Sequence, residues 1–197
     1  MTFRSSGLIF MCAAFSSDIL AKESLMKIYR CRICDQAYVG ARKPANCPFC
    51  GAAEKYMILA KNWKEEMIST LTDVSEKHLK TAIDMEIECS GFYRCASRVA
   101  HDEEVKAMFC AIARIEAEHA ATIRRMLGLP RAGSMEHEGR CYPSEAQNLA
   151  EARRKETLCV SFYDEAAKQA SEKRVREVMV ALSEIERDHL AMSSRKL

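Results

Sequence analysis

Two stretches of the sequence decide the fold: VKAMFCAIARIEAEHAA at residues 105–121 and VREVMVALSEIERDHLA at residues 175–191. They align without a gap at an offset of 70 residues, and both carry the pattern Glu-x-x-His. The match extends backward at the same offset, since EIECSGFY at residues 86–93 corresponds to ETLCVSFY at residues 156–163. A register that persists over two segments and the turn between them indicates a duplicated helix–turn–helix unit.

Two such units predict a four-helix bundle. Apolar residues recur every three or four positions through both units, which is the period of amphipathic helices. Turns near His101–Asp102 and Ser171–Glu172 are short enough to make the helices of each unit antiparallel. About 16 extended residues, as in segment 127–143 between the units, reach roughly 50 Å, whereas a helix of ~26 residues is ~39 Å long. The sequence therefore predicts a mainly α fold over residues 72–197, with one long crossover and with Ser144 capping the third helix.

Each expected helix carries one glutamate on its apolar stripe, and the second and fourth helices add a histidine one turn later. Buried carboxylates without partners are too costly to keep ionised, and four of them at one level would repel each other. Two divalent cations would cancel that charge. One Glu from each of two helices plus Glu-x-x-His from the other two is the ligand set of di-iron carboxylate bundles, and this mixture of donors suits Fe, Mn or Zn. The candidate ligands are Glu86, Glu116, His119, Glu156, Glu186 and His189.

Other side chains on the same stripes lie close to these ligands. We expect the hydroxyls of Tyr93 and Tyr163 to hydrogen-bond ligand carboxylates, with plain aromatic packing as the alternative. Cys89 and Cys159 are expected to be small core residues, with a redox-active thiol as the alternative. Further titratable residues fall off the stripes or have no partner in register, and are expected at the surface: His78, His101, His137, Glu88, Glu118 and Asp188.

Residues 26–52 form a separate, turn-rich module with two Cys-x-x-Cys motifs, followed by an expected linker over residues 53–71. Four thiolates from two such motifs form a tetrahedral set that suits Zn²⁺ or a single iron ion. A structural zinc ribbon is the plain alternative. We favour iron, because a one-electron iron centre makes chemical sense beside a two-electron dinuclear site. The four candidate ligands are Cys31, Cys34, Cys47 and Cys50.

Composition limits the function further. A net charge of +2 provides no large basic surface for nucleic acid. No apolar run approaches the roughly 20 residues of a membrane span, so we expect neither partner. Ten cysteines also suit a secreted disulfide scaffold, but a long helical chain does not need disulfide cross-links to fold. Metal ligation in a reducing, cytoplasmic compartment is therefore preferred. The cysteines outside the cluster are scattered: Cys12, Cys89, Cys95, Cys110, Cys141 and Cys159.

Residues 1–25 share none of these patterns. Their first 18 residues contain one arginine and a short apolar stretch over residues 7–15, with a poor cleavage-site pattern. The sequence MKIYRCRIC, beginning at Met26, looks like a natural start. We expect residues 1–25 to be a dispensable extension, disordered or a misannotated start. A targeting signal and a real helix are the alternatives.

The chain resembles rubrerythrins of the reversed-order type. YRCRICDQAYVGARKPANCPFCGA at residues 29–52 is similar to their rubredoxin-like module, and the six candidate ligands of the helical repeats resemble those of their di-iron domain. The resemblance covers about residues 26–195, and it is specific because two independent metal patterns coincide. It implies an N-terminal rubredoxin-like four-cysteine module followed by a ferritin-like di-iron four-helix bundle.

The resemblance implies an oxidoreductase that reduces hydrogen peroxide to water at the di-iron site. Electrons would come one at a time from the four-cysteine iron centre, which an NAD(P)H-dependent rubredoxin reductase or a rubredoxin would supply. It also implies a homodimer or a larger assembly, in which the two centres often meet across a subunit boundary. Two alternatives remain open: a ferroxidase or iron-handling protein, and a non-enzymatic zinc-ribbon adaptor on a metal-stabilised bundle.

One position departs from the family pattern. Typical rubrerythrins carry a further Glu on the third helix, three residues after the ligand Glu, which is associated with a redox-linked change of ligands. Here Cys159 occupies that position. The expected site is therefore the symmetric six-ligand form, and the departure bears on the rate and mechanism of peroxide reduction rather than on metal binding.

Overall fold

The computed structural model describes most of the chain: residues 26–66, 68, 70–130 and 139–195. The expected extension, residues 1–25, lies outside the described residues, and Cys12 lies within it. The middle of the crossover, residues 131–138, also lies outside them, and so does His137.

Four long helices make up the larger part of the fold: α1 (Asp73–Val99), α2 (Glu103–Met126), α3 (Glu145–Gln169) and α4 (Lys173–Ser194). Three of them begin at a side-chain cap. Thr72, Asp102 and Ser144 each accept a hydrogen bond from a backbone amide of the first turn. Such caps satisfy amide groups that the helix itself leaves without partners. Ser144 thus caps the third helix, as its sequence predicts.

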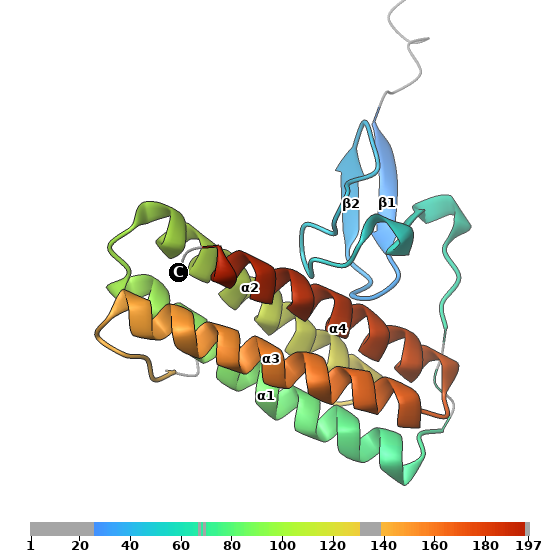
Figure 1. Ribbon diagram of the computed structural model, residues 1–197. Helices are drawn as coiled ribbons and strands as arrows, with labels where there is room; N and C mark the ends of the chain where they lie inside the picture. The colour runs from blue at the N-terminus through green and yellow to red at the C-terminus, as the bar shows by residue number, and fades with distance from the viewer. Residues whose placement is uncertain (1–25, 67, 69, 131–138, 196–197) are drawn as a thin grey trace, which may run out of the picture.

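The connections give the helices the order of a ferritin-like bundle (Figure 1). At one end, Glu145 at the start of α3 accepts hydrogen bonds from the amides of His101 and Asp102 in the α1–α2 turn, at 2.7 and 3.0 Å. At the other end, Glu172 in the α3–α4 turn accepts from the amide of Thr72, just before α1, at 2.6 Å. The chain must therefore cross the length of the bundle between α2 and α3. The predicted fold class is confirmed.

The inner faces of the helices are apolar and closely packed. Large side chains fill the core from α2 and α4, with Phe109, Ile112, Met179 and Leu182 at most 1% exposed. Alanines are frequent on the inner stripes of α1 and α3 and are buried there. Small residues let helix backbones approach closely, which brings α1 and α3 near enough for their side chains to bond across the bundle.

The N-terminal part is a small antiparallel sheet carrying two cysteine turns. Strands β1 (Lys27–Cys31), β2 (Ala37–Gly40) and β3 (Met57–Leu59) pair in the order β2-β1-β3. Two short 3-10 helices, η2 (Glu54–Tyr56) and η3 (Ala60–Asn62), flank β3. The sheet holds the first Cys-x-x-Cys turn between β1 and β2 and the second before η2.

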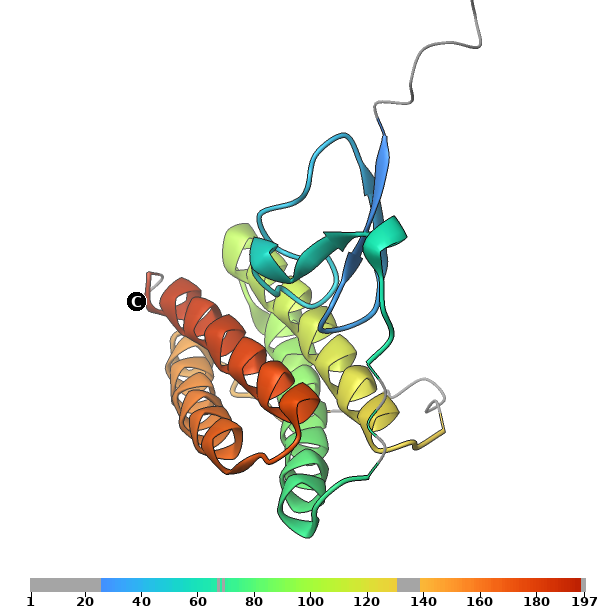
Figure 2. The ribbon, with the colours of Figure 1, turned by 90° about the vertical axis from the view of Figure 1, so that its right-hand side faces the viewer.

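This module lies on helices α2 and α4, on the side of the bundle away from α1 and α3 (Figures 1 and 2). Gly51, after the second cysteine turn, has a φ of +78°, and a Cβ there would lie 3.2 Å from Cγ2 of Ile185. Charged contacts surround this point: Arg32 Nε donates to Glu177 Oε1 at 2.9 Å, and Lys55 pairs with Glu184 at 2.6 Å. The module therefore docks on the bundle of its own chain.

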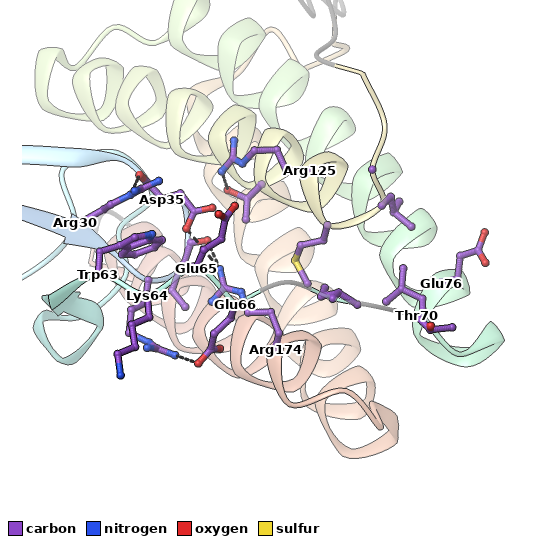
Figure 3. A pocket seen from close by; sticks show the side chains of 18 residues that line it. Arg30, Asp35, Trp63, Lys64, Glu65, Glu66, Thr70, Glu76, Arg125 and Arg174 are labelled. Carbon is purple, nitrogen blue, oxygen red and sulfur yellow. Dashed lines mark hydrogen bonds and ion pairs between the residues drawn. The ribbon is translucent and has the colours of Figure 1, made fainter. Parts of the chain in front are cut away.

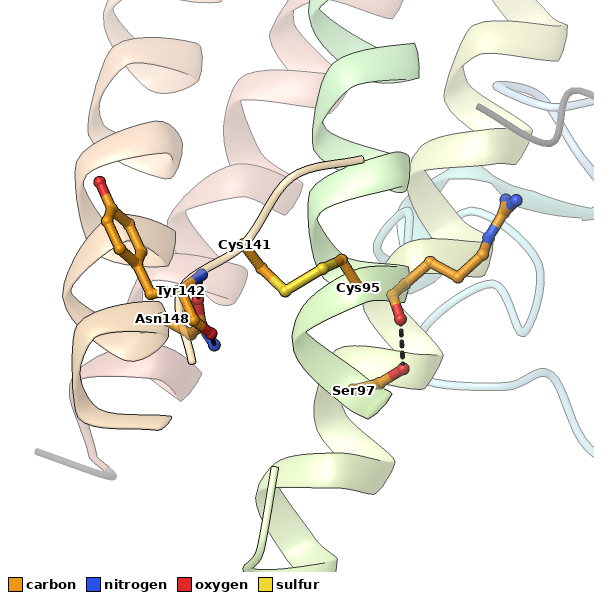
Figure 4. Close-up of a disulfide and its surroundings, with 6 residues drawn as sticks. Cys95, Ser97, Cys141, Tyr142 and Asn148 are labelled. Atoms are coloured by element: carbon orange, nitrogen blue, oxygen red, sulfur yellow. Dashed lines mark hydrogen bonds between the residues drawn. A yellow bond between two sulfur atoms is a disulfide. The ribbon is translucent and has the colours of Figure 1, made fainter. Parts of the chain in front are cut away.

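One pair of the scattered cysteines forms a disulfide (Figure 4). Cys95 on α1 bonds to Cys141, in the segment just before α3, with the Cα atoms 5.7 Å apart. The side chain of Asn148 bonds both the amide and the carbonyl of Tyr142, at 2.8 and 2.9 Å, and so holds that segment in place. The expectation that the scattered cysteines form no disulfide was wrong for these two. Among the described residues, Cys89, Cys110 and Cys159 are free thiols outside the cluster.

Among the described residues, no helix is both long and apolar enough to cross a bilayer.

Candidate metal centres

The six candidate ligands of the bundle meet between the four helices. Each lies on the inner stripe of its helix, and each is at most 2% exposed. They fall into two overlapping groups, in each of which one ligand atom per residue lies within 4.8 Å of the others. One group comprises Glu86, Glu116, His119 and Glu186. The other comprises Glu116, Glu156, Glu186 and His189.

The overlap assigns different positions to the four carboxylates. Glu116 and Glu186 belong to both groups, so they lie where carboxylates would bridge two ions, and the other residues lie at the outer ends. His119 Nδ1 is 2.9 Å from Glu116 and 3.4 Å from Glu186. His189 Nδ1 is 3.0 Å from Glu116 and 2.9 Å from Glu186. This near-symmetry follows from the 70-residue duplication.

The outer carboxylates are electrostatically disfavoured as anions. Burial and the neighbouring charge of Glu116 raise the pKa of Glu86 well above its ordinary value. Burial and the charge of Glu186 raise the pKa of Glu156 in the same way. Desolvation and like charge both penalise the ionised form, so these two carboxylates need a cation or a proton nearby.

The bridging carboxylates and the histidines behave differently. Burial opposes ionisation of Glu116, but the imidazoles of His189 and His119 outweigh it and hold the pKa of Glu116 below its usual range. Burial would lower the pKa of His189, yet Glu116 and Glu186 raise it to about 10. The pKa of His119 is also raised, by Glu86 and its neighbours against the effect of burial. A proton on each outer carboxyl and a second proton on each imidazole would add four positive charges, the same charge that two divalent cations would bring in their place.

The carboxylate oxygens support the same interpretation. Oε1 of Glu116, Oε2 of Glu156 and Oε1 of Glu186 are buried and accept no hydrogen bond from the described residues. His189 Nδ1 lies near two of these carboxylates, but a ring nitrogen carries at most one proton. Glu116 Oε1 lies 3.0 Å from Nδ1 of His189, and Glu186 Oε1 lies 3.4 Å from Nδ1 of His119. Buried polar atoms are almost always bonded, so carboxylate oxygens that share so few donors fit ligands of bound cations.

Two tyrosines hold the outer carboxylates across the bundle. The hydroxyl of Tyr93 on α1 donates to Oε1 of Glu156 on α3, and the hydroxyl of Tyr163 on α3 donates to Oε1 of Glu86 on α1. Burial, followed by the nearby carboxylates, raises the pKa of each tyrosine well above its ordinary value, so the hydroxyls stay protonated donors. The structure therefore shows the expected hydrogen bonds in addition to aromatic packing.

The four cysteines of the module form a second, smaller cluster. Their side chains are at most 2% exposed. Sγ of Cys31 lies 3.7 Å from Sγ of Cys50, and Sγ of Cys34 lies 3.7 Å from Sγ of Cys47. A tetrahedral metal with bonds of about 2.3 Å to sulfur would place its ligands about 3.8 Å apart. The thiols are thus spaced as ligands of one metal ion, and this spacing suits zinc and iron equally.

A hydrogen bond links the two candidate centres. His119 Nε2 lies 2.9 Å from the backbone carbonyl oxygen of Cys50. A carbonyl only accepts, so Nε2 donates, and Nδ1, which faces the carboxylates, is the nitrogen that would bind a cation in place of its proton. Cys50 therefore contributes a thiol to the cysteine cluster and orients a candidate ligand of the bundle cluster. The two clusters meet within one chain.

Arginines and a cavity border the first cysteine turn (Figure 3). Arg125 Nη2 donates to the carbonyl of Cys34 at 2.7 Å, and Arg174 Nη2 donates to the carbonyl of Ile33 at 3.1 Å. Beside them lies a cavity of about 550 Å³ between the module, the linker and the ends of α2 and α4, lined in part by Trp63 and Asp35. None of the described residues that line it is among the six candidate ligands of the bundle, so it is separate from the candidate dinuclear site.

Several of these features have no signal in the sequence. The carbonyl of Cys50 acts through the backbone, which no side-chain pattern reports. Nothing in the sequence distinguishes Arg125 and Arg174, which bond the first cysteine turn to the helices, from ordinary surface residues. Two residues expected at the surface are half-buried: His78 packs against the ring of Phe162, and Glu118 accepts from Gln36 at 3.3 Å.

The fold and the clusters define a class of protein, a ferritin-like carboxylate–histidine bundle with a four-cysteine module. The rubrerythrin family model matches residues 77–197, so the chain belongs to the rubrerythrin family. That match covers the bundle, and the rubredoxin-like character of the module stays a prediction. A hypothetical protein, Pfu-1136390-001 from Pyrococcus furiosus, is similar in structure, with a TM-score of 0.54 and 20% identity over 62% of this chain and 87% of that chain. This likeness concerns the fold alone. No curated protein matches the sequence.

Proposed function

We propose that this protein is a rubrerythrin-type peroxide reductase, which reduces hydrogen peroxide to water with electrons passed from the four-cysteine centre to the dinuclear site. The proposal is carried by the hydrogen bond between His119 and the carbonyl of Cys50, because it joins a ligand of one cluster to a ligand of the other. Two iron ions held by the six bundle ligands would supply the two electrons that cleavage of the O–O bond requires, and an iron ion held by the cysteines would replace them singly.

The chain itself restricts what reaches the bundle site. All six ligands are almost completely buried, so a small neutral oxidant such as hydrogen peroxide is favoured over larger substrates. Tyr93 and Tyr163 hold Glu156 and Glu86 in fixed orientations. Fixed ligands keep the site in one geometry as its charge changes, which is how outer-sphere groups support a metal centre.

The electron path follows the backbone of the second cysteine turn. It runs from the thiol of Cys50 through its carbonyl to the imidazole of His119, which involves covalent bonds and one hydrogen bond of 2.9 Å. Gly51 supports this approach, because a side chain at that position would press on Ile185 of α4. The docking of the module is thus part of the proposed path.

An external donor would reach the module at its outer side. The cysteines are buried, but Phe49, between Cys47 and Cys50, is 38% exposed. This exposed ring offers a contact for an NAD(P)H-dependent rubredoxin reductase or a rubredoxin, which we propose as the donor. We also propose a cytoplasmic location and a homodimer or larger assembly, by analogy with the family.

The test is a visible spectrum of the full chain, purified anaerobically with its metals and analysed for metal content. We expect an absorption from the oxidised iron–thiolate centre that bleaches with reductant and returns on addition of hydrogen peroxide. A colourless protein with zinc at the cysteines and no peroxide turnover would support the adaptor hypothesis instead. Iron loading beyond two ions per bundle, with O₂ as the oxidant, would support the ferroxidase.

Variants separate the two centres. Glu116→Ala or His189→Ala should remove the dinuclear metals while the four-cysteine metal persists, and stoichiometric dinuclear iron in either variant would contradict the assignment. Cys47→Ser should stop steady turnover but leave a single peroxide-driven oxidation of the pre-reduced bundle. Unimpaired steady turnover of that variant would refute the proposed electron path.

A further inference from the structure

Two buried thiols lie beside the dinuclear site and take no part in the function proposed above. Cys89 on α1 and Cys159 on α3 occupy equivalent positions of the duplication, one turn after the ligands Glu86 and Glu156. Each is 4% exposed, and both are free thiols.

The hydrogen bonds of the tyrosines fix the alignment of α1 against α3. Tyr93 reaches Glu156, and Tyr163 reaches Glu86. In an antiparallel pair with these two contacts, the position opposite Cys89 is residue 160, which is adjacent to Cys159. The inner stripes of both helices face each other at this level, so the two thiols point toward one another. In agreement, each thiol has the largest single effect on the pKa of the other.

A cation lies next to this pair. Lys155, one turn before Cys159 on α3, has its Nζ 5.5 Å from the ring centre of Phe92 and 2.6 Å from Oε1 of Glu88. Its positive charge acts to lower the pKa of Cys89, but burial and the carboxylates of Glu116 and Glu86 raise that pKa overall, and the pKa of Cys159 is raised as well. A neighbouring ammonium group favours the thiolate, which is the form that attacks peroxide. Lys155 therefore provides a counter-ion for a thiolate once one forms at this pair.

We propose that Cys89 and Cys159 form a second redox site, a dithiol that hydrogen peroxide oxidises to a disulfide between α1 and α3. One thiol attacks peroxide, the O–O bond breaks, and a sulfenic acid and one water form. The second thiol then attacks that sulfur, the S–S bond forms, and a second water leaves. Two thiols lose two electrons in all, and one peroxide gains them.

This reaction differs from the proposed iron chemistry in its source of electrons. The dithiol reduces one peroxide per chain from its own electrons, and an external thiol must reduce the disulfide before it can act again. It shares only the oxidant with the proposed function. The substitution of Cys159 for the usual family carboxylate thereby gives the bundle a reducing group of its own.

The experiment treats the metal-loaded full chain with one equivalent of hydrogen peroxide, alkylates free thiols under denaturing conditions and maps tryptic peptides. We expect a cross-link between peptides 81–94 and 156–168, which contain Cys89 and Cys159, with loss of both from the alkylated pool. The cross-link should disappear in Cys89→Ser and in Cys159→Ser, and it should persist in the control Cys110→Ser, which removes an exposed thiol.

Several outcomes would overturn the inference. Both thiols fully alkylated after treatment, or oxidation of one thiol to a sulfinic or sulfonic acid without the cross-link, would show that the pair is not a redox couple. Steady peroxide turnover by the iron sites without a cross-link would refute this inference and leave the proposed function unaffected. A cross-link that forms while the iron spectrum fails to respond to peroxide would support it and count against the proposed function.

Discussion

Removing the disulfide should destabilise the bundle strongly. Cys95 and Cys141 are 46 residues apart in the sequence, so the bond closes a long loop in the unfolded chain. The loop-entropy relation for cross-links gives about 4 kcal/mol for a loop of this length. For a chain of this size, a loss of 1 kcal/mol lowers Tm by about 2–4 °C. The variant Cys141→Ser should therefore unfold about 8–16 °C lower than the wild type.

The assays are thermal unfolding and urea unfolding, each followed by far-ultraviolet circular dichroism at equal metal loading and with and without a thiol reductant. Reductant should move the wild type toward the variant and leave the variant unchanged. The slope of free energy against urea should also be larger for the variant, because an uncross-linked chain exposes more surface. Cys110→Ser is the matched control, and its loss of an exposed thiol should change the stability by no more than about 0.5 kcal/mol. Equal midpoints for wild type and Cys141→Ser, in the presence and absence of reductant, would refute the reasoning.

Three further changes test the docking and the site. Arg32 holds the pKa of Glu177 below its usual value against the opposing effect of burial. The ion pair therefore stabilises the folded protein above about pH 4.3, and this stabilisation is lost as pH falls. Glu177→Gln should flatten the pH dependence of the unfolding free energy, measured by the fluorescence of the single tryptophan. Gly51→Ala, with its φ of +78° and its contact with Ile185, should cost about 1–2 kcal/mol of unfolding free energy in urea and slow electron transfer. Tyr163→Phe should lower the stability of the metal-free protein by about 1–3 kcal/mol, measured by thermal unfolding.

The bundle is predictable from sequence because its pattern occurs twice. A single Glu-x-x-His is common on exposed helix faces, but the copies at Glu116 and Glu186 share a register with apolar residues on both sides. Helical period then determines which side chains face inward. The segment between the units is long enough for the connection to cross the bundle. Local rules of this kind are sufficient for the helices, their caps and the six inward-facing ligands.

The contacts between units are of a different kind. Cys95 and Cys141 pair because the described end of the crossover passes α1, and nothing in the spacing of two scattered cysteines indicates that approach. The carbonyl of Cys50 meets His119 only after the module has docked. Both depend on how separate elements pack, for which the sequence provides no period and no motif.

Docking of the module also breaks the symmetry that the duplication creates. Gly51 approaches Ile115 and Ile185, which are equivalent residues of the two repeats, so the module lies over both halves of the bundle. Its hydrogen bond nevertheless goes to His119, whereas the described bond of His189 runs through Nδ1 to Glu186. Two nearly equivalent outer ligand sets thus become unequal through one backbone carbonyl. If electrons follow that bond, the end of the site formed by Glu86 and His119 would receive them before the end formed by Glu156 and His189.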